Sequence, residues 1–198
     1  MPTTRMTGPE RREQLIGVAR SVFAERGYQA ATVEEIADRA GVTKPVVYQH
    51  FGGKEGMHAV VVDRAVTELT SRLSEALDVD SMGLAAHRSA SAFLEFIEDH
   101  EEAFRVLLHG APTGDGGGSL GLVIGDIAAK AEHLLATQFA DRGFDESTAP
   151  MYARMLVGAT ALVGEWWLEV REPSREVVAR HIVNLTWNGL RHLERVDE

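Results

Sequence analysis

The sequence lacks several features that would each identify a class of protein. It contains no cysteine, which excludes disulfide bonds, thiolate metal sites and cysteine nucleophiles. No apolar run reaches the roughly 18 residues of a membrane-spanning helix. No basic-then-apolar leader opens the chain, so secretion is not indicated either. We therefore expect a cytoplasmic protein that has no membrane partner.

Catalytic signatures are missing as well. The eight histidines and 30 acidic residues form no His-Glu-x-x-His, Gly-x-Ser-x-Gly or acidic calcium-loop pattern. His100 has acidic neighbours, but successive residues of a helix point in different directions and do not converge on a metal ion. Four glycines within residues 114–118 predict a loop over 111–119, and no Gly-Lys-Ser/Thr follows it, as a phosphate-binding loop requires. These observations predict no enzyme, no metal site and no cofactor.

Lysine is scarce, and the charge is unevenly distributed along the chain. Two of the three lysines, Lys44 and Lys54, lie within the first 56 residues. Residues 1–56 carry 8 basic and 7 acidic side chains, a net charge of +1, whereas residues 57–198 carry 12 and 23, a net charge of −11. An acidic body repels DNA everywhere except at its near-neutral head. The distribution therefore favours DNA contact through the N-terminal region.

Residues 32–51 indicate two short helices joined by a tight turn. Thr32 followed three residues later by Glu35 is the pattern of a capping box, in which each side chain satisfies a free backbone amide. The first helix is therefore expected over 33–40. Gly41 can adopt the positive φ that ends a helix.

The second helix of this pair is expected over 44–50, after a turn at 41–43. Thr43 can cap it, and Pro45 lies in its first turn, where a missing amide hydrogen costs nothing. Two short helices with such a turn are typical of a helix-turn-helix that reads DNA.

The faces of the second helix divide between the protein core and DNA. Val47 and Phe51, four residues apart, are expected to point inward together. The N-terminal residues of a recognition helix meet base edges in the major groove. Lys44 suits guanine O6 and N7, and Pro45 or Val46 suits a thymine methyl group.

Other residues of this region are expected to contact the DNA backbone. Tyr48, His50 and Lys54 are candidates for phosphate contacts, and so are the amide-rich helix starts at Thr32 and Thr43. Phosphate contacts set the register, whereas base contacts select the sequence. The complete set of expected DNA-binding residues is Thr32, Thr43, Lys44, Pro45, Val46, Tyr48, Gln49, His50 and Lys54.

The order and spacing of these motifs carry a resemblance. The run contains Phe23-Ala-Glu-Arg-Gly-Tyr28, Thr32-Val-Glu-Glu-Ile-Ala37, Gly41-Val-Thr-Lys-Pro-Val-Val-Tyr-Gln-His-Phe51 and Lys54-Glu55. It resembles the tetracycline-repressor (TetR) family of bacterial transcription regulators. The resemblance implies that Lys44, Tyr48, His50 and Lys54 occupy positions that usually touch DNA. Gly52-Gly53 departs from the family pattern, which more often has polar residues there.

The remaining sequence predicts a second, larger helical domain. Forty-four per cent of the residues are apolar, which is enough for a sizeable core. Helical periodicity predicts a long helix over 54–77 and further helices at 81–98, 101–109, 119–141, 148–170 and 174–195. We expect an all-α protein of about nine helices. Residues 1–56 are expected to form the three-helix DNA-binding domain, and residues 57–198 the ligand-binding and dimerisation domain.

The helix expected over 148–170 is apolar nearly all round, so it must be covered on two sides. One stripe contains Met151, Met155, Ala159, Leu162 and Trp166, and its neighbour contains Tyr152, Leu156, Val163 and Trp167. The last helix is widely apolar too, and two such helices from each of two chains would form a four-helix dimer interface. The TetR resemblance implies the same homodimer. The expected interface residues are Val163, Trp167, Ile182, Trp187 and Leu190, and the alternative is that both helices are simply core.

Aromatic and methionine residues of the C-terminal domain suggest a ligand cavity. Methionine adapts to irregular spaces, and small-molecule sites combine apolar walls with a few polar groups. The expected effector is a small hydrophobic compound, although aromatic residues at helical spacing also serve as ordinary core. The candidate ligand-binding residues are Phe93, Phe96, Phe104, Tyr152, Met155 and Trp166.

Two functions follow from these features. The first is a transcription regulator, a repressor in our interpretation, that binds a palindromic double-stranded operator as a dimer and is released by an effector. The second is a helical small-molecule or protein-binding module that has lost sequence-specific DNA binding. Intact Lys44, Tyr48 and Lys54 favour the first.

Overall fold

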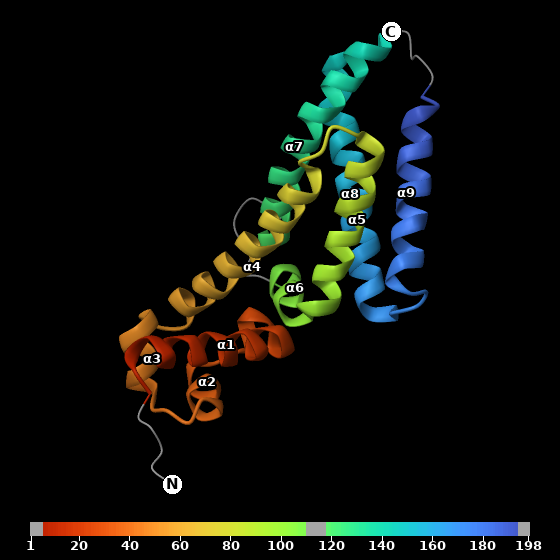
Figure 1. Ribbon diagram of the computed structural model, residues 1–198. Helices are drawn as coiled ribbons and strands as arrows, with labels where there is room; N and C mark the ends of the chain where they lie inside the picture. The colour runs from red at the N-terminus through yellow and green to blue at the C-terminus, as the bar shows by residue number, and fades with distance from the viewer. Residues whose placement is uncertain (1–5, 110–117, 194–198) are drawn as a thin grey trace. The chain divides into compact units, whose positions relative to one another are not determined.

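A computed structural model describes residues 6–109 and 118–193, and within these ranges the chain is all-α (Figure 1). The described part contains nine α-helices, one 3-10 turn and no strand, as the sequence predicts. The elements are α1 (Gly8–Ala30), α2 (Val33–Arg39), α3 (Lys44–Phe51), α4 (Lys54–Leu77), α5 (Met82–Asp99), α6 (Glu101–Leu108), α7 (Gly118–Arg142), η1 (Glu146–Thr148), α8 (Ala149–Val170) and α9 (Arg175–Arg191).

The helix starts in the N-terminal region use different caps. A complete capping box begins α1, because the Thr7 amide donates to the Glu10 carboxylate at 2.7 Å while the Thr7 hydroxyl accepts from the Glu10 amide. The box expected at α2 is only half formed. The Thr32 hydroxyl accepts from the Glu35 amide at 3.1 Å, but the Glu35 carboxylate accepts from Arg39 instead of from Thr32.

The turn between α2 and α3 follows the sequence prediction in its backbone. Gly41 has a φ of 65°, which a side chain would strain. The expectation that the Thr43 side chain caps α3 is wrong, since its hydroxyl makes no capping hydrogen bond. Pro45 stands in the first turn of α3 as expected, and its fixed φ suits a helix start.

The chain divides into two compact units. Unit 1 consists of Met1–Thr67 and Glu102–Leu120, and unit 2 of Glu68–Glu101 and Gly121–Glu198. Helix α4 contributes to both, because the division falls inside it. The expected boundary at residue 56 lies near the start of the same helix.

Unit 1 has one apolar core, formed mainly by α1, α2, α3 and the first part of α4. Its fully buried members include Leu15, Phe23, Ile36, Val47 and Met57, and Val106 of α6 belongs to the same cluster. Ala37 is buried as well, in keeping with a close approach of helices at this small residue. Helices α2 and α3 therefore pack on the same apolar core as α1 and the first part of α4.

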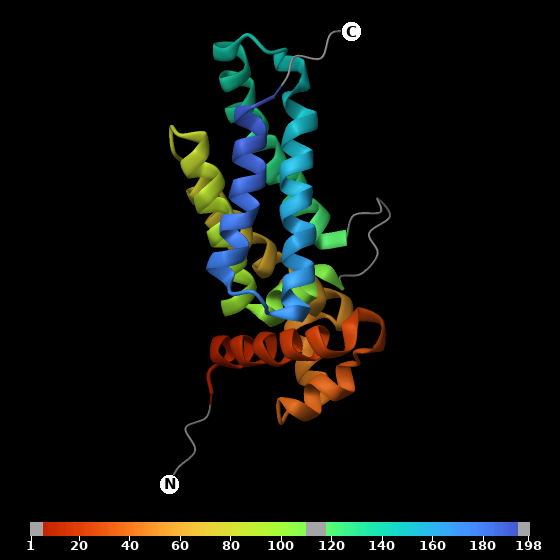
Figure 2. The same ribbon diagram turned by 90° about the vertical axis from the view of Figure 1, so that its right-hand side faces the viewer.

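Unit 2 is a helical bundle in which α5 packs against both α8 and α9. Figure 2 shows α8 and α9 side by side over much of their length. The contact between α5 and α8 is tight, since a Cβ atom added at Gly164 would lie 2.3 Å from the Phe93 ring. Glycine is required at this crossing because any side chain would displace Phe93 and Ile97.

Two remaining expectations concern the rest of the chain. The glycine-rich loop predicted over 111–119 falls largely outside the described residues. Among the helices that the structure describes, none combines the length and the apolar character needed to cross a membrane.

Candidate nucleic-acid interface and apolar groove

The recognition-type helix α3 is anchored on one side and exposed on the other. Val47 is completely buried and Phe51 is half-buried against the unit 1 core, as predicted. Along the outer side, Lys44, Pro45, Tyr48 and Gln49 are exposed, whereas Val46 and His50 are half-buried. The outer side of α3 therefore exposes the Lys44 ammonium group, the apolar surfaces of Pro45 and Tyr48, and the Gln49 amide within two helical turns.

Lys44 is held by an acidic partner on the neighbouring helix. Its Nζ lies 3.0 Å from Oε2 of Glu34, and the two side chains are 50% and 65% exposed. Sequence reasoning missed this pair because Glu34 lies ten residues away on another helix. Thr32, Thr43 and Glu34 are all exposed near the same helix starts.

Lys54 makes contacts within the protein that the sequence did not predict. Its ammonium donates to the backbone carbonyl of Gln29 at 3.0 Å and lies 4.5 Å from the centre of the Tyr28 ring. The start of α4 is thereby tied to the end of α1. Lys54 is half-buried, so its phosphate contact remains a prediction in which the ammonium is shared with Gln29.

Next to this contact lies a buried histidine. His58 is 7% exposed, and its ring packs edge-on against Phe23 at 4.9 Å and in a tilted arrangement against Tyr28 at 4.6 Å between centroids. Burial lowers the pKa of His58, and the nearby Lys54 charge lowers it further. The imidazole is therefore kept neutral in the folded protein under conditions where an exposed histidine would begin to charge.

The depressed pKa of His58 predicts acid sensitivity of unit 1. As pH falls below the ordinary histidine pKa of about 6.5, the unfolded chain takes up a proton that the folded chain resists, so stability decreases. Replacing His58 by phenylalanine keeps an aromatic ring and removes the titration. Between pH 7.5 and 5.5, the wild type should lose more melting temperature than the variant in thermal unfolding. Parallel losses in the two proteins would contradict the assignment.

Ion pairs hold α1 and α2 together behind this surface. The Arg39 guanidinium donates two parallel hydrogen bonds to Glu25 of α1, at 2.7 and 2.8 Å, and a third to Glu35 at 2.7 Å. The bonds from Arg39 lower the pKa of the Glu25 carboxyl group. Arg12 of α1 lies over the ring of Phe51, 4.9 Å from its centre, and so connects α1 to the end of α3.

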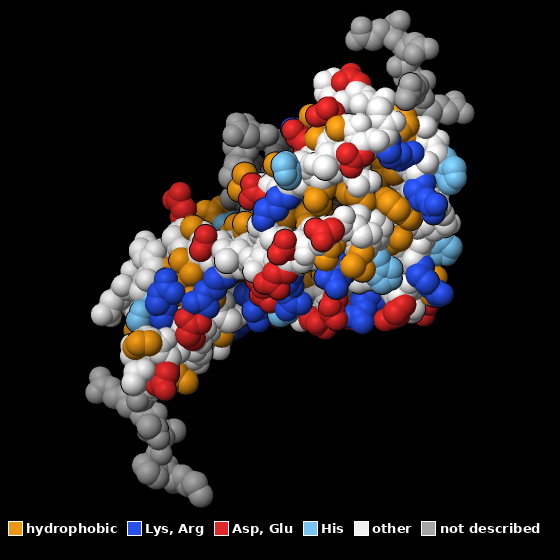
Figure 3. All heavy atoms as spheres, turned by 45° about the horizontal axis from the view of Figure 1, so that its top comes forward, with side chains coloured by type: hydrophobic (Ala, Val, Ile, Leu, Met, Phe, Trp, Pro, Cys, Tyr) orange, Lys and Arg blue, Asp and Glu red, His pale blue; other side chains and the backbone are white. Residues whose placement is uncertain are grey.

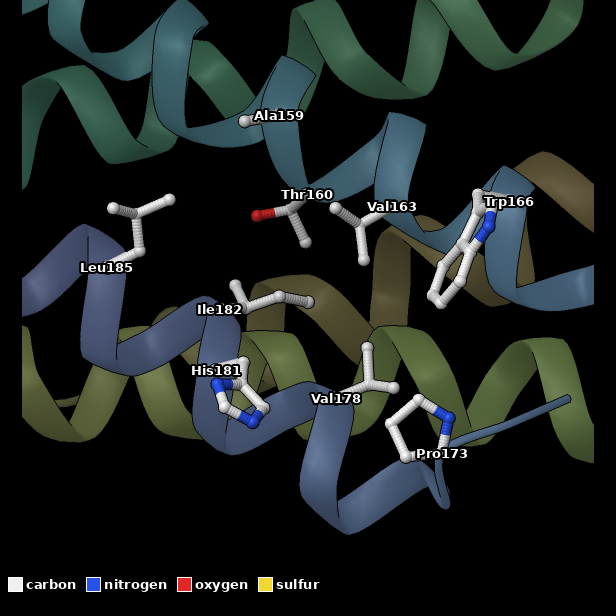
Figure 4. A pocket seen from close by; sticks show the side chains of 9 residues that line it. All are labelled: Ala159, Thr160, Val163, Trp166, Pro173, Val178, His181, Ile182 and Leu185. Carbon is white, nitrogen blue, oxygen red and sulfur yellow. The ribbon is translucent and has the colours of Figure 1, made fainter. Parts of the chain in front are cut away.

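A second surface feature is an apolar groove of about 300 Å³ between α8 and α9. In Figure 4, the side chains of Val163 from α8 and of Val178 and Ile182 from α9 point toward one another across it. The nine residues that line the groove are Ala159, Thr160, Val163, Trp166, Pro173, Val178, His181, Ile182 and Leu185. Two of the expected dimer residues, Val163 and Ile182, therefore lie in the same groove.

An exposed apolar stripe continues from this groove along α8. Its members, spaced by about one or two helical turns, are Met151, Met155, Leu162, Trp166 and Val170. Leu185 of α9 is 77% exposed beside them. Contiguous exposed apolar side chains on a helix pair mark an interaction surface rather than a solvated face.

The two tryptophans of α8 differ in burial within one chain. Trp167, expected at a dimer interface, is 2% exposed, and its indole Nε1 donates to the carbonyl of Pro173 at 2.8 Å. Trp166, expected in a ligand cavity, is 49% exposed in the groove. Leu190, also expected at the interface, is buried within one chain in the core cluster of α7, α8 and α9, and its contact with a partner stays a prediction. Trp187 is half-buried against Gly83 of α5.

The six candidate ligand-binding residues are divided between the two compact units. Phe104 belongs to unit 1 and the other five belong to unit 2. Phe93 and Phe96 are buried, and Tyr152 packs edge-on against Phe139 at 5.3 Å. Met155 and Trp166 are exposed and Trp166 lines the α8–α9 groove, so ligand contact at these two residues stays a prediction.

The surface charge is mixed on the face in Figure 3, where Lys and Arg side chains alternate with Asp and Glu. Within residues 6–109 and 118–193, no three His, Asp or Glu residues form a group that could hold a metal ion.

Comparison with known proteins identifies the family of this helical chain. The family model for bacterial regulatory proteins of the tetR family matches residues 15–61, and that for the tetracyclin repressor-like C-terminal domain matches residues 84–189. The chain belongs to the TetR family. The N-terminal match covers α2 and α3, and the C-terminal match covers α8 and most of α9.

Relatives of known role support the same membership. This TetR-family chain is 32% identical over 195 residues to the HTH-type transcriptional activator FasR of Mycolicibacterium smegmatis, covering 96% of this chain and 87% of that protein. It is 30% identical over 195 residues to the HTH-type transcriptional repressor Rv3405c of Mycobacterium tuberculosis, covering 90% and 94%. The protein is a transcription regulator with a helix-turn-helix, and not an enzyme.

Solved structures share the fold over most of this chain. A TetR-like transcriptional regulator from Rhodococcus sp. RHA1 aligns with a TM-score of 0.79 at 24% identity, covering 96% of this chain and 100% of that one. The fatty acid degradation regulator FadR from Bacillus halodurans aligns with a TM-score of 0.73 at 19% identity, with the same coverage. The TetR fold therefore includes both compact units.

Proposed function

We propose that this TetR-family regulator represses transcription by binding a palindromic DNA operator as a homodimer, and that a small hydrophobic effector releases it. In this proposal residues 1–56 bind DNA, residues 57–198 bind the effector and the partner, and the protein acts in the cytoplasm. The observation that carries the proposal is the outward face of α3, whose exposed Lys44, Pro45 and Tyr48 stand on a fully buried Val47.

The proposed DNA contacts follow from the chemistry of that face. Lys44 donates to guanine O6 and N7, and Pro45 or Val46 contacts a thymine methyl group. Tyr48, Gln49 and His50 lie farther along α3 and reach the backbone or adjacent bases. Backbone and side-chain groups at Thr32, Thr43 and Lys54 add phosphate contacts.

The proposed dimer forms through α8 and α9. Each protomer offers the groove with Val163, Ile182 and Leu185 and the stripe that continues from it. A two-fold axis brings the same surface of both chains together and buries these apolar side chains. Two heads in one dimer then match two half-sites about one helical turn, roughly 34 Å, apart.

Effector release requires that ligand and DNA favour different separations of the two heads. Helix α4 is the proposed connection, since residues of one continuous helix belong to both compact units. A coupling of about 1–3 kcal/mol between the sites is enough for such a switch. Relatives include both an activator and a repressor, so an expression assay must determine the sign of regulation.

Fluorescence anisotropy tests the DNA contacts, with DNA from upstream of the protein's own gene and with random DNA across a salt series. Tyr48→Ala should weaken binding to both DNAs by a similar factor, because a backbone contact carries no sequence information. Lys44→Ala should weaken specific binding by about 1–3 kcal/mol more than random binding, because it removes a base contact.

The wild type should bind the specific DNA with two protomers per site and with strong salt dependence. An equal loss on both DNAs for Lys44→Ala would remove its role in base reading. If the wild type binds the two DNAs equally, selection from genomic fragments decides between a distant operator and a head that does not read sequence.

A further inference from the structure

The ion pair between Lys44 and Glu34 joins the two helices of the DNA-binding motif at their N-terminal ends. Lys44 is the first residue of α3, and Glu34 is the second residue of α2. Their charged atoms, Nζ and Oε2, lie 3.0 Å apart, and at least half of each side chain is exposed. The pair therefore stands at the end of α3 that a recognition helix turns toward base edges.

Protein stability does not account for this pair. Exposed ion pairs contribute about 0–1 kcal/mol to folding. Helix α2 is already tied to α1 by the two parallel hydrogen bonds from Arg39 to Glu25. A carboxylate on a DNA-facing surface also opposes binding, because it repels phosphates. A favourable contact between Glu34 and DNA would offset this repulsion.

We propose that Lys44 and Glu34 together read one G·C base pair in each half-site. Lys44 donates to guanine O6 and N7, while Glu34 accepts a hydrogen bond from the N4 amino group of the paired cytosine. The inference rests on the proposed function, since it assigns a base preference to the same DNA-binding face. Glu34 becomes a residue that determines sequence specificity, in addition to the residues expected from the sequence.

The geometry of the pair matches the edge of this base pair. Guanine O6 and cytosine N4 are joined by a hydrogen bond in the base pair, so they lie about 2.9 Å apart, and both are exposed in the major groove. A donor and an acceptor held 3.0 Å apart, as Nζ and Oε2 are, can face that acceptor and donor together. The side chains need not separate to bind.

The same geometry disfavours the other base pairs. Guanine places two acceptors, N7 and O6, side by side next to the cytosine donor, whereas adenine places its donor N6 between two separate acceptors. An ammonium group can share both guanine acceptors but only one acceptor of an A·T pair. Reversal to C·G places the carboxylate near the guanine acceptors, which repel it. One orientation of one base pair is therefore preferred.

Removal of the carboxylate should change specificity and non-specific affinity in opposite directions. Glu34→Ala takes away the acceptor for cytosine N4, so discrimination at one base pair of each half-site should fall about 5- to 10-fold. It also removes a negative charge near phosphates, so binding to random DNA should become tighter. A purely structural role would not combine a loss of preference at one defined base pair with tighter binding to random DNA.

The test is selection from a random-sequence DNA library by the full-length wild type, Glu34→Ala, Lys44→Ala and Asp63→Ala, followed by anisotropy on single-base-pair variants of the selected site. Asp63→Ala is the matched control, because it removes an exposed carboxylate of unit 1 from α4. Glu34→Ala and Lys44→Ala should lose preference at the same G·C pair, and Asp63→Ala should select the wild-type motif.

Each result has a distinct meaning. Loss of preference at different pairs, or an unchanged motif with Glu34→Ala, overturns the joint reading of one base pair while leaving the regulator intact. A wild-type motif with no G·C pair at the affected position does so as well. Failure of the wild type to select any motif overturns the proposed function itself. Equal thermal unfolding of the wild type and Glu34→Ala establishes that a changed preference does not come from misfolding.

Discussion

Replacing Leu185 by glutamate should convert the proposed homodimer into a monomer with little effect on the folding of each chain. Leu185 is 77% exposed in the protomer and lies in the α8–α9 groove. A glutamate there is solvated in a single chain. In the proposed dimer, the two-fold axis would bury one such carboxylate from each protomer.

The expected loss of affinity is large. An uncompensated buried charge costs several kcal/mol. Each 1.4 kcal/mol is a factor of ten, so two charges together with the lost apolar contact should weaken dimerisation about a thousandfold or more. Because each monomer carries one head, operator binding should also lose the gain from joining two half-site contacts, which is about 10²- to 10⁴-fold.

Sedimentation velocity at micromolar protein measures this effect. Leu122→Glu is the matched control, because Leu122 is 62% exposed on α7 of the same unit and does not line the groove. The control should sediment as the wild type does, while Leu185→Glu sediments as a monomer. A dimer that persists in Leu185→Glu would place the interface on another surface, and a monomeric Leu122→Glu would point to α7.

Helix bounds could be predicted from the sequence because the signals that set them are local. Pro45 and Gly41 act through their own backbone geometry, so α3 begins where the sequence indicates and the turn before it has the expected positive φ. Hydrogen-bond partners were less predictable. Glu35 has Arg39 within one helical turn, and this charged partner displaces the Thr32 amide that the capping pattern suggests.

The orientation of α8 could not be predicted from apolar periodicity, because both of its stripes are apolar. Packing against α5 determines which stripe of α8 is buried, because Phe93 and Ile97 of α5 occupy the space left by Gly164. A signal was present in the small residues. Ala161 and Gly164 are buried and share a face with Trp167, so a close helix contact at Gly164 implies that Trp167 is turned inward.

The side-chain contacts of the candidate site that the sequence did not predict all join separate helices. The ion pair of Lys44 with Glu34 forms only when α2 and α3 pack on the unit 1 core. The hydrogen bond from Lys54 to the Gln29 carbonyl likewise requires that α1 and α4 pack on this core. For the predicted ligand-binding residues, the amino-acid type alone does not separate a cavity wall from a core. Phe93 and Phe96 have the composition of a cavity wall, yet the same side chains fill the ordinary core of unit 2.

Trp167→Ala should destabilise the protein by about 3–5 kcal/mol, the typical cost of truncating a buried aromatic residue to alanine. The Trp167 ring is 2% exposed, and Arg171 lies over it at 5.0 Å from the guanidinium carbon to the ring centre. Truncation also leaves the Pro173 carbonyl without its 2.8 Å hydrogen bond from the indole. A cavity and an unsatisfied acceptor therefore act together.

Trp166→Ala is the neighbouring control, because the two tryptophans differ in burial but share one turn of α8. Urea unfolding at two protein concentrations separates their roles. Trp167→Ala should lose the same free energy of unfolding at both concentrations, since the loss lies within one chain. Trp166→Ala should lose stability through a weaker dimer, whose contribution depends on concentration. A Trp167→Ala loss below 1 kcal/mol, or a concentration-dependent one, would return Trp167 to the dimer interface.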